Sequence, residues 1–502
     1  MSNTGPESAG PPAASGGGKA GLRPAGADAG EGRESWEPVI GLEIHVQLKT
    51  ETKMFCRCVS GFGGGENEQT CPVCLGHPGA LPVPNRRAIE ETIKLGLALG
   101  CEIAPRAVFH RKNYFYPDNP KAYQISQYDE PLCANGRFSV PGENGDLEVG
   151  IVRAHLEEDA AKNVHVGESG RISRATATLV DFNRCGTPLV EIVTGPDIHS
   201  ADDAKRFLQL LRRTVVELGL SDAEMEKGSM RFDVNVSIRP AGSDELRTRT
   251  ELKNMNSFAF AAKGIEREVS RQIAIYEAGG EVEQETLHFD PGHETAPPLR
   301  SREEAQDYRY FPEPDLVPIE PPADLVDRLR AELPELPAAR IRRLEGSVGL
   351  YNAQVLVTGG LDGAFEALAA AGAPGRTAAN WLANDFVATG EDPAAINVAE
   401  WAKVLAAWER IPRPTRVEAT AASVSGSLDA AAFTDQVAVS DVSELDPVID
   451  GVLAASEPQV AAYRGGKEVL LGFFVGQVMK QTGGKADPKV VSERIREKLG
   501  SP

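Results

Sequence analysis

Residues 41–48 read Gly-Leu-Glu-Ile-His-Val-Gln-Leu, and their pattern predicts the element around which the fold is built. Large apolar side chains alternate strictly with polar ones, which is the period of a β-strand that packs one face on a core. The opposite face then carries Glu43 and His45 side by side. A polar face of this kind is ordinarily solvated, so a functional interpretation requires other residues that share it.

The segments around this strand predict more strands and several helices. From about residue 105 to 195, short apolar runs are broken by Gly, Pro, Asn and Asp, which indicates a largely antiparallel sheet. Residues 230–239 alternate again and predict a strand with one polar face. Ser200 followed by Asp203 resembles a capping box, which marks the start of a helix. Helices with the expected apolar period cover residues 86–100 and 200–219, and a second long helix is expected around 256–278.

Changes in composition divide the chain into four expected parts. Residues 1–35 are rich in Gly, Ala, Pro and Ser and are expected to be disordered, because they cannot bury enough apolar surface to offset the entropy of ordering. A Pro-rich stretch at 312–322 precedes an Ala-rich helical region, whose last helix is expected near 466–481 before Gly483 and Gly484. The expected fold class is therefore α+β, with a mainly antiparallel-sheet domain flanked by helices and then an all-α tail. The three domains that follow residues 1–35 are expected at 36–322, 323–415 and 416–502.

Whole-chain properties restrict the class of protein. The 502 residues are 41% apolar and 25% charged, which is an ordinary globular balance. No apolar run approaches the roughly 20 residues needed to cross a bilayer. A signal-peptide core is also absent, so a cytoplasmic protein with no membrane contact is expected. The formal charge of −20 argues against a generally basic surface, so any nucleic-acid contact is expected to be a local patch.

Several carboxylates are candidates to join this polar face in a metal site. Residues 157–159 are Glu-Glu-Asp, and three adjacent negative charges repel one another unless water or cations separate them. Glu191 stands in an apolar run, where an unpaired and desolvated charge costs roughly several kcal/mol. Asp233 lies on the polar face of the strand at 230–239. Each carboxylate alone is most simply explained by solvation. Together they would suit Mg²⁺, or Mn²⁺ if a histidine also binds.

Four of the seven cysteines crowd into residues 56–74, as Cys56-x-Cys58 and Cys71-x2-Cys74 around a Gly-rich insert. In a chain without a secretory signal, such clustering indicates metal binding more than disulfides. Four thiolates with short inner spacings are typical of a structural Zn²⁺ clip. The Cys-x-Cys pair is tighter than the common Cys-x2-Cys, and four incidental thiols are the alternative.

A basic and aromatic stretch is the last candidate. Residues 110–118 read His-Arg-Lys-Asn-Tyr-Phe-Tyr-Pro-Asp and residues 123–127 read Tyr-Gln-Ile-Ser-Gln. Such residues could stack a base and hold a phosphate, although a packed aromatic turn explains the pattern at least as well. None of the Gly-Lys pairs is followed by Ser or Thr, so a Walker A loop is absent and the ATP-binding residues are not identified. A nucleophile elbow is absent too.

Taken in order, these segments resemble the GatB family, the B subunit of the aspartyl/glutamyl-tRNA(Asn/Gln) amidotransferases. The resemblance covers nearly everything from about residue 37 to 502. The archaeal relative, the E subunit, carries a synthetase-like insertion that is not present here, so the B subunit is preferred. The stretches that carry the resemblance are residues 41–48, 71–82, 111–118, 123–127, 155–162, 181–193, 228–237, 251–258 and 307–316.

The resemblance implies a two-step amidation of mischarged Glu-tRNA(Gln) or Asp-tRNA(Asn). ATP would phosphorylate the aminoacyl side-chain carboxylate, and ammonia would then displace the phosphate. Ammonia would come from a glutaminase, the A subunit, while a small partner, the C subunit, would clasp the pair. The sheet region would form a catalytic cradle domain, and the tail, with a YqeY-like end, would grip the tRNA.

The resemblance also implies site residues. Glu43, His45, Glu158 and Glu191 would be catalytic and would hold Mg²⁺, with Glu157 and Asp233 as further members. The four clustered cysteines, Cys56, Cys58, Cys71 and Cys74, would bind a structural Zn²⁺. The sequence departs from the family pattern at Ala161, where the family usually has Gly, and at Cys185, where it has a small aliphatic residue.

Two other functions are compatible with parts of the sequence. A non-catalytic zinc scaffold could bind tRNA for another enzyme, but it gives no reason for Glu191 and the acidic run to accompany Glu43 and His45. A self-contained hydrolase could use Cys185 as nucleophile, but no partner base is evident.

Overall fold

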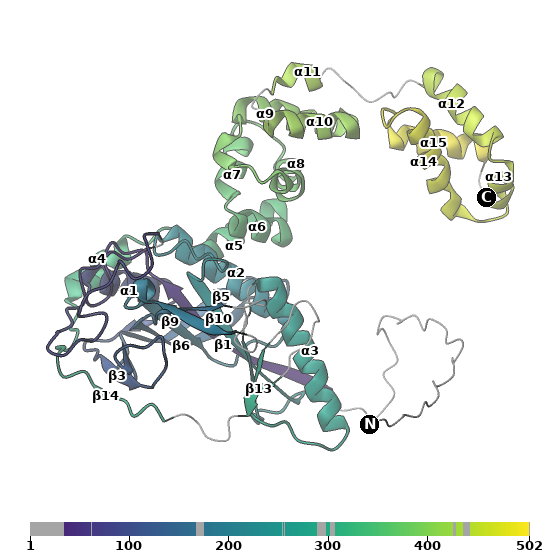
Figure 1. Cartoon of the computed structure of the whole chain (residues 1–502). Helices are drawn as coiled ribbons and strands as arrows, with labels where there is room; N and C mark the ends of the chain where they lie inside the picture. The colour runs from purple at the N-terminus through teal and green to yellow at the C-terminus, as the bar shows by residue number, and fades with distance from the viewer. Residues whose placement is uncertain are drawn as a thin grey trace, which may run out of the picture.

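A computed structural model describes residues 35–500 except 62, 167–174, 254, 256, 289–297, 302–306, 425–427 and 435–441. The tail predicted over residues 1–35 lies, apart from its last residue, outside this part of the chain. Figure 1 shows a sheet with covering helices in purple to teal, followed by helices in green and then in yellow. This order, a sheet domain and then an all-helical tail, confirms the predicted α+β class.

Within the described residues, nine strands form the main sheet in the order β13-β12-β11-β10-β1-β9-β6-β5-β2. Neighbouring strands are antiparallel except β11 and β12, which run parallel, so the predicted mainly antiparallel sheet is confirmed. The strands are β1 (Trp36–Gln47), β2 (Glu102–Ile103), β5 (Cys133–Val140), β6 (Leu147–Glu158), β9 (Pro188–Thr194), β10 (Met230–Pro240), β11 (Thr250–Lys253), β12 (Glu285–His288) and β13 (Pro298–Ser301).

Two small sheets accompany the main one. The first has the order β14-β3-β4, from β3 (His110–Asn113), β4 (Tyr123–Ser126) and β14 (Phe311–Pro312), so it contains most of the basic and aromatic stretch. The second is the pair β7 (Lys162–Val166) and β8 (Ala177–Asp181). Strand β4 contacts β6, which places the first small sheet beside the centre of the main sheet.

Three helices pack on the apolar face of the main sheet, and all three were predicted: α1 (Arg86–Ala98), α2 (Ala201–Glu217) and α3 (Phe258–Glu277). Ser200 caps α2 by accepting the Asp203 N–H at 3.0 Å. The helices share one hydrophobic core with Leu42, Ile44 and Val46 of β1, each at most 1% exposed. The opposite face of β1, with Glu43 and His45, is left for polar contacts.

From residue 323 onward, all regular secondary structure in the described part of the chain is helical. The helices α4 to α11 share the core of the sheet domain, whereas α12 to α15 enclose a second core around Ile449, Phe474 and Ile495. The helices are α4 (Ala323–Ala331), α5 (Pro337–Val348), α6 (Leu350–Gly359), α7 (Asp362–Ala370), α8 (Gly375–Asn380), α9 (Val398–Ala406), α10 (Arg413–Val424), α11 (Ala430–Thr434), α12 (Val442–Ala454), α13 (Glu457–Arg464), α14 (Leu471–Gln481) and α15 (Pro488–Leu499).

The predicted last helix near 466–481 was only partly right. Helix α14 begins at Leu471 after a short 3-10 turn, and it ends before Gly483 and Gly484 as expected. A further helix, α15, follows that break, because Asp487 caps it and Pro488 suits a first helical position. Among the described residues, no helix has both the length and the apolar character that a membrane span requires.

A candidate metal centre on the polar sheet face

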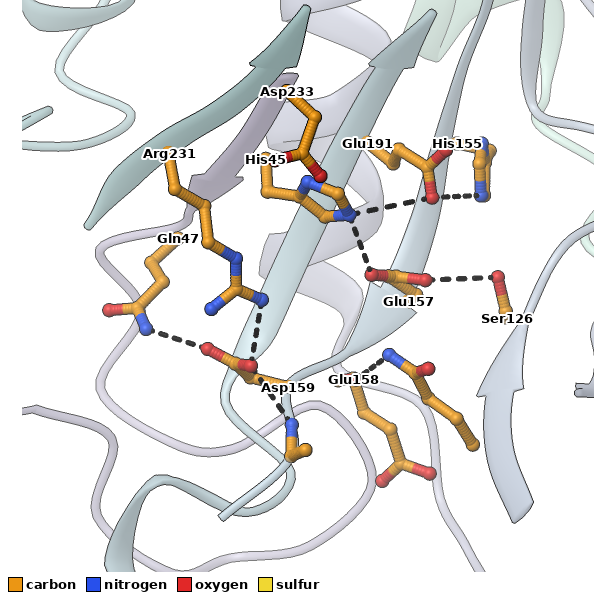
Figure 2. Close-up of polar contacts among 12 residues, drawn as sticks. His45, Gln47, Ser126, His155, Glu157, Glu158, Asp159, Glu191, Arg231 and Asp233 are labelled. Atoms are coloured by element: carbon orange, nitrogen blue, oxygen red, sulfur yellow. Dashed lines mark hydrogen bonds and ion pairs between the residues drawn. The ribbon is translucent and has the colours of Figure 1, made fainter. Parts of the chain in front are cut away.

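The register of four strands brings polar residues into one row across the sheet. His45 on β1 pairs with Arg231 on β10 and with Glu191 on β9, and Glu191 pairs in turn with His155 on β6. Directly paired residues of adjacent strands point to the same face. The four side chains therefore project together from the face opposite the apolar core (Figure 2).

Three side chains of this face form a compact group. His45 Nε2 lies 3.5 Å from Glu157 Oε1 and 3.6 Å from Glu191 Oε2. One ligand atom from each of the three residues lies within 4.8 Å of the other two. Both carboxylates are buried, at 2% and 7% exposure. Two buried carboxylates beside one imidazole need a shared positive charge, which a proton on His45 or a metal cation supplies.

Neighbouring side chains orient the two carboxylates. His155 Nε2 lies 3.5 Å from the same Glu191 oxygen that faces His45, and Ser126 Oγ donates to Glu157 Oε2 at 3.4 Å. The Ser126 hydroxyl thereby binds Oε2 of Glu157, and Oε1 remains directed toward His45, as Figure 2 shows. Contacts of this kind fix the orientation of ligands around a metal.

The charges of this group shift its pKa values. Burial lowers the pKa of His45, but the hydrogen bond and charge of Glu191 and the charge of Glu157 raise it overall. Burial raises the pKa of Glu191, but the neighbouring imidazoles hold it well below its ordinary value. The pKa of His155 is lowered, chiefly by burial. In the absence of a cation, His45 thus binds a proton more tightly than His155 does.

Asp159 follows β6 and points to the same region, but arginines neutralise it. Its carboxylate accepts from Gln47 Nε2 at 2.8 Å and from Arg231 at 2.9 Å, and Arg184 Nε lies 3.6 Å away. Burial raises the pKa of Asp159, yet the two guanidinium groups lower it below its ordinary value. This carboxylate is already paired, so it is not free to bind a cation.

The basic and aromatic stretch borders the carboxylate group. Burial lowers the pKa of Lys112, but the charges of Glu157 and Glu191 raise it overall, so its ammonium stays charged beside them. Lys112 Nζ lies 5.1 Å from the centre of the Tyr308 ring, and Tyr310 stacks on Tyr128 with ring centres 4.3 Å apart. The stretch thus contributes a cation, and Tyr128, Tyr308 and Tyr310 add aromatic rings from outside it. A cation beside aromatic rings is a feature of surfaces that bind nucleotides.

The four clustered cysteines also meet in space. One Sγ from each of Cys56, Cys58, Cys71 and Cys74 lies within 4.8 Å of the others, and the sulfurs of Cys71 and Cys74 are 3.9 Å apart. The hydrogen bond from Cys56 is the main cause that lowers the pKa of Cys74 to about 5, with the backbone and Lys53 adding to it. The cluster is a second candidate metal centre, formed entirely of sulfur.

Two known domain families match this chain. Residues 38–327, more than half of the chain, match the family described as the GatB/GatE catalytic domain, and residues 419–499 match the GatB domain. The chain belongs to the GatB family. The resemblance inferred from the sequence is therefore confirmed.

Relatives of the GatB family match more than nine-tenths of the chain. The aspartyl/glutamyl-tRNA(Asn/Gln) amidotransferase B subunit of Geobacter sulfurreducens is 48% identical over 488 residues, which cover 93% of this chain and 99% of that protein. The subunits of the same name from Syntrophotalea carbinolica and Moorella thermoacetica are 46% and 45% identical, covering 92% of this chain and 98% and 100% of those proteins.

The structure distributes the residues expected of a GatB site over three places. His45, Glu191 and Glu157 form the compact group. Glu43 and Asp233 pair across β1 and β10 on the same face, where Asn235 Nδ2 donates to Glu43 at 3.3 Å and Lys253 Nζ contacts Asp233 at 2.6 Å.

The third place holds Glu158, which lies on the opposite face. Its carboxylate contacts the Lys121 ammonium and accepts the Ile125 N–H at 2.9 Å. The period of β6 explains this, because Glu158 and Glu157 are neighbours on one strand and point to opposite faces.

Sequence reasoning missed several residues that surround the candidate metal centre. His155, Ser126 and Lys112 surround the carboxylates but were not singled out as members. The alternation of β6 was the available signal, since His155 and Glu157 are two residues apart and share a face. For Lys112 and Ser126 no such local signal exists, because they reach the centre from the small sheet β14-β3-β4.

Proposed function

We propose that this chain activates the side-chain carboxylate of mischarged Glu-tRNA(Gln) or Asp-tRNA(Asn) with ATP, as the GatB subunit of a tRNA-dependent amidotransferase. The relatives that match more than nine-tenths of its length are named as this subunit. The observation that carries the proposal is the buried group of His45, Glu157 and Glu191 beside the charged Lys112.

The three side chains fit a small divalent cation. A cation with bonds of about 2.1 Å spaces its ligands roughly 3–4 Å apart, and the imidazole nitrogen lies 3.5 and 3.6 Å from the two carboxylate oxygens. His45, Glu157 and Glu191 would hold Mg²⁺ or Mn²⁺, and Glu43 and Asp233, on the same face, are further candidates. When bound, the cation would neutralise charge on the phosphate and on the accepting carboxylate.

The protein's own residues would position the reactants. Lys112 offers a positive charge to an incoming phosphate, because the charges of Glu157 and Glu191 raise the pKa of its ammonium and its Nζ lies 5.1 Å from the centre of the Tyr308 ring. His155 contacts the Glu191 oxygen that faces His45, and Ser126 binds the Glu157 oxygen that does not face it. Both carboxylates therefore keep their orientation when substrate enters. Glu158 would act separately, since its pair with Lys121 anchors the end of β6 from the opposite face.

We propose that ammonia for the second step comes from partner subunits, a glutaminase (the A subunit) held in place by a small protein (the C subunit). The relatives' name, the B subunit of an amidotransferase, supports partner subunits. Cys185 does not favour a hydrolase within this chain. Its thiol is 2% exposed and donates to the Cys74 carbonyl at 3.2 Å, and burial is the main cause that raises its pKa to about 12. A thiol of this kind is a poor nucleophile.

We also propose that Cys56, Cys58, Cys71 and Cys74 bind a structural Zn²⁺. Tetrahedral Zn–S bonds of about 2.3 Å imply sulfurs about 3.8 Å apart. The 3.9 Å between the sulfurs of Cys71 and Cys74 agrees with that value. The sulfur-only donor set suits Zn²⁺ better than Mg²⁺, which prefers oxygen.

Substitutions at the carboxylate group test the proposed activity. In the complex with its partner subunits, His45→Ala and Glu157→Gln should lower the ATP-dependent amidation of mischarged tRNA by roughly 100-fold, which is the effect of losing about 3 kcal/mol of charge stabilisation. Ammonium salt replaces glutamine as nitrogen donor, so the glutaminase step does not limit the assay. Glu148→Gln, an exposed change on the same strand β6, is the matched control.

Normal amidation by both variants would contradict the assignment of the site. Phosphate transfer that continues when this chain is omitted from the complex would instead show that the chain is a tRNA-binding scaffold.

A further inference from the structure

Lys53 carries a charge that the proposed reaction does not use, and it is fully buried beside the cysteine cluster. Its Nζ donates to the Gln69 carbonyl at 2.8 Å and lies 3.8 Å from the Sγ of Cys74. A longer contact of 3.5 Å reaches the carbonyl of Phe182. An isolated ammonium in such a place would cost roughly several kcal/mol, so its contacts indicate a specific electrostatic role.

The chemistry of the cluster explains why a cation belongs there. Four thiolates around one Zn²⁺ leave a net charge of −2, and one of these sulfurs, that of Cys74, is buried. Negative charge in a low-dielectric site is costly unless a positive group compensates it. The Lys53 ammonium lies close enough to Cys74 to offset part of this charge and to donate a charge-assisted hydrogen bond to the thiolate.

The same lysine joins the cluster to the turn that leads into β9. Phe182 begins a 3-10 turn that ends at Arg184, the residue that reaches Asp159. Gly186 donates its N–H to the Asp159 carbonyl at 2.9 Å. It has φ +83°, and a Cβ added there would lie 3.5 Å from Lys53 Cδ, so the turn packs directly on this side chain.

The backbone of Lys53 completes the connection. Its N–H donates to the Cys58 carbonyl at 3.0 Å, and the next N–H, that of Met54, donates to the Gly186 carbonyl at 2.8 Å. One residue thus touches both halves of the cysteine cluster and the turn that supports Asp159.

We propose that Lys53 is a positioning residue that neutralises the zinc–cysteine cluster and holds it against the turn at residues 182–186. Zinc binding is thereby coupled to the position of Asp159 and of the adjoining end of β6, which carries Glu157. This inference rests on the zinc clip proposed above. On this inference, the zinc clip stabilises the local fold and also supports the carboxylate centre.

The test compares zinc retention in the complete complex. Lys53→Met should release zinc to a chromogenic chelator about 10–100-fold faster than the wild type, as is usual when a contact to a metal ligand is lost. In Co²⁺-loaded protein, the sulfur-to-metal charge-transfer band should move to lower energy, while the ligand-field bands of a four-sulfur site persist. Hydrogen exchange at the amides of residues 182–187 should also become faster.

Lys49→Met is the matched control, because Lys49 is an exposed lysine that precedes Lys53 by four residues, and its zinc release should stay at the wild-type rate. Lys53→Gln keeps a hydrogen-bond donor without the charge, and it supplies the comparison if Lys53→Met does not fold.

One contrary result is a wild type that contains zinc while Lys53→Met and Lys53→Gln release it at the wild-type rate and keep the wild-type Co²⁺ spectrum. That result would overturn the role of Lys53 and leave the clip intact. A wild-type complex that contains no zinc would overturn the clip and, with it, the role of Lys53. Neither result depends on whether the tRNA is amidated.

Discussion

At the scale of single residues, three consecutive carboxylates at the end of β6 have three different environments. Glu157 faces His45, Glu158 contacts Lys121 on the opposite face, and Asp159 is paired with arginines. The strand period separates the first two, and the arginines neutralise the third. Adjacent residues of the same chemical type therefore differ in what they can bind, because the fold gives each a different partner.

Replacing Asp159 with asparagine tests the arginine pairing. Asp159→Asn removes the carboxylate that Arg231 and Arg184 contact, so we expect a loss of about 2–3 kcal/mol in the free energy of unfolding. This is less than the roughly 3–5 kcal/mol of a fully buried pair, because both guanidinium groups reach solvent. Urea unfolding at neutral pH measures the difference between variant and wild type.

The difference in unfolding free energy between wild type and Asp159→Asn should become smaller as the pH falls. The pKa of Asp159 is lowered in the folded protein, so its contribution is complete above the pKa of the unfolded chain, about 4, and is lost as the pH falls through the folded pKa. The gap between wild type and Asp159→Asn should stay constant from about pH 7 to 5 and narrow below about pH 4. A gap that widened on acidification would show that the carboxylate is not stabilised by these arginines.

At the scale of elements, the contact of α1 with the sheet depends on a glycine within the helix. A Cβ added at Gly96 would lie 2.4 Å from the Sγ of Cys133 and 2.9 Å from its Cβ, and Cys133 is fully buried on β5. The helix thus approaches the strand more closely than any larger residue would allow. Helix propensity alone would favour alanine at this position.

Gly96→Ala should therefore destabilise the protein. Overpacking of about 1–3 kcal/mol outweighs the gain of about 1 kcal/mol in helix propensity, so the unfolding midpoint of the sheet domain should fall. Gly346→Ala in α5 is the matched control, because a Cβ there meets nothing within 4 Å. Scanning calorimetry should show a small rise for the control. A rise for both variants would mean that Cys133 moves aside at little cost.

At the scale of the whole molecule, the described residues form two separate hydrophobic cores. The sheet domain and helices α1 to α11 share the first core, and α12 to α15 form the second. The carboxylate group and the cysteine cluster both belong to the sheet domain, and none of their residues lies after residue 191. Residues 435–441, which connect the two cores, lie outside the described part of the chain.

This division predicts the effect of truncation. A chain that ends at Thr434 should bind Mn²⁺ with an affinity within about twofold of the full chain, because sites without shared partners act independently. If the tail grips tRNA, as the family resemblance implies, the same truncation should weaken tRNA binding by the complex. Titration with Mn²⁺ and a tRNA binding assay measure the two effects separately. Loss of Mn²⁺ affinity on truncation would show that the second core supports the metal centre.

The sequence alone determined the features that depend on local periodicity and spacing. Alternation placed Glu43 and His45 on one strand face, the helical period and end signals located α1 and α2, and the cysteine spacing indicated a cluster. These signals are local because side-chain direction repeats every two residues in a strand and every 3.6 in a helix. The family resemblance, carried by long motifs, was determined at this level as well.

Only the tertiary structure decided which carboxylates join His45. The register of β1, β9 and β6 places Glu191 and Glu157 beside His45, and the side chain of Glu158 lies on the other face of the sheet. Lys112, Ser126 and the buried Lys53 acquire their contacts from segments distant in sequence. Register and burial are set by packing across strands, and a shift of one residue reverses every side chain, so no local pattern could specify these contacts.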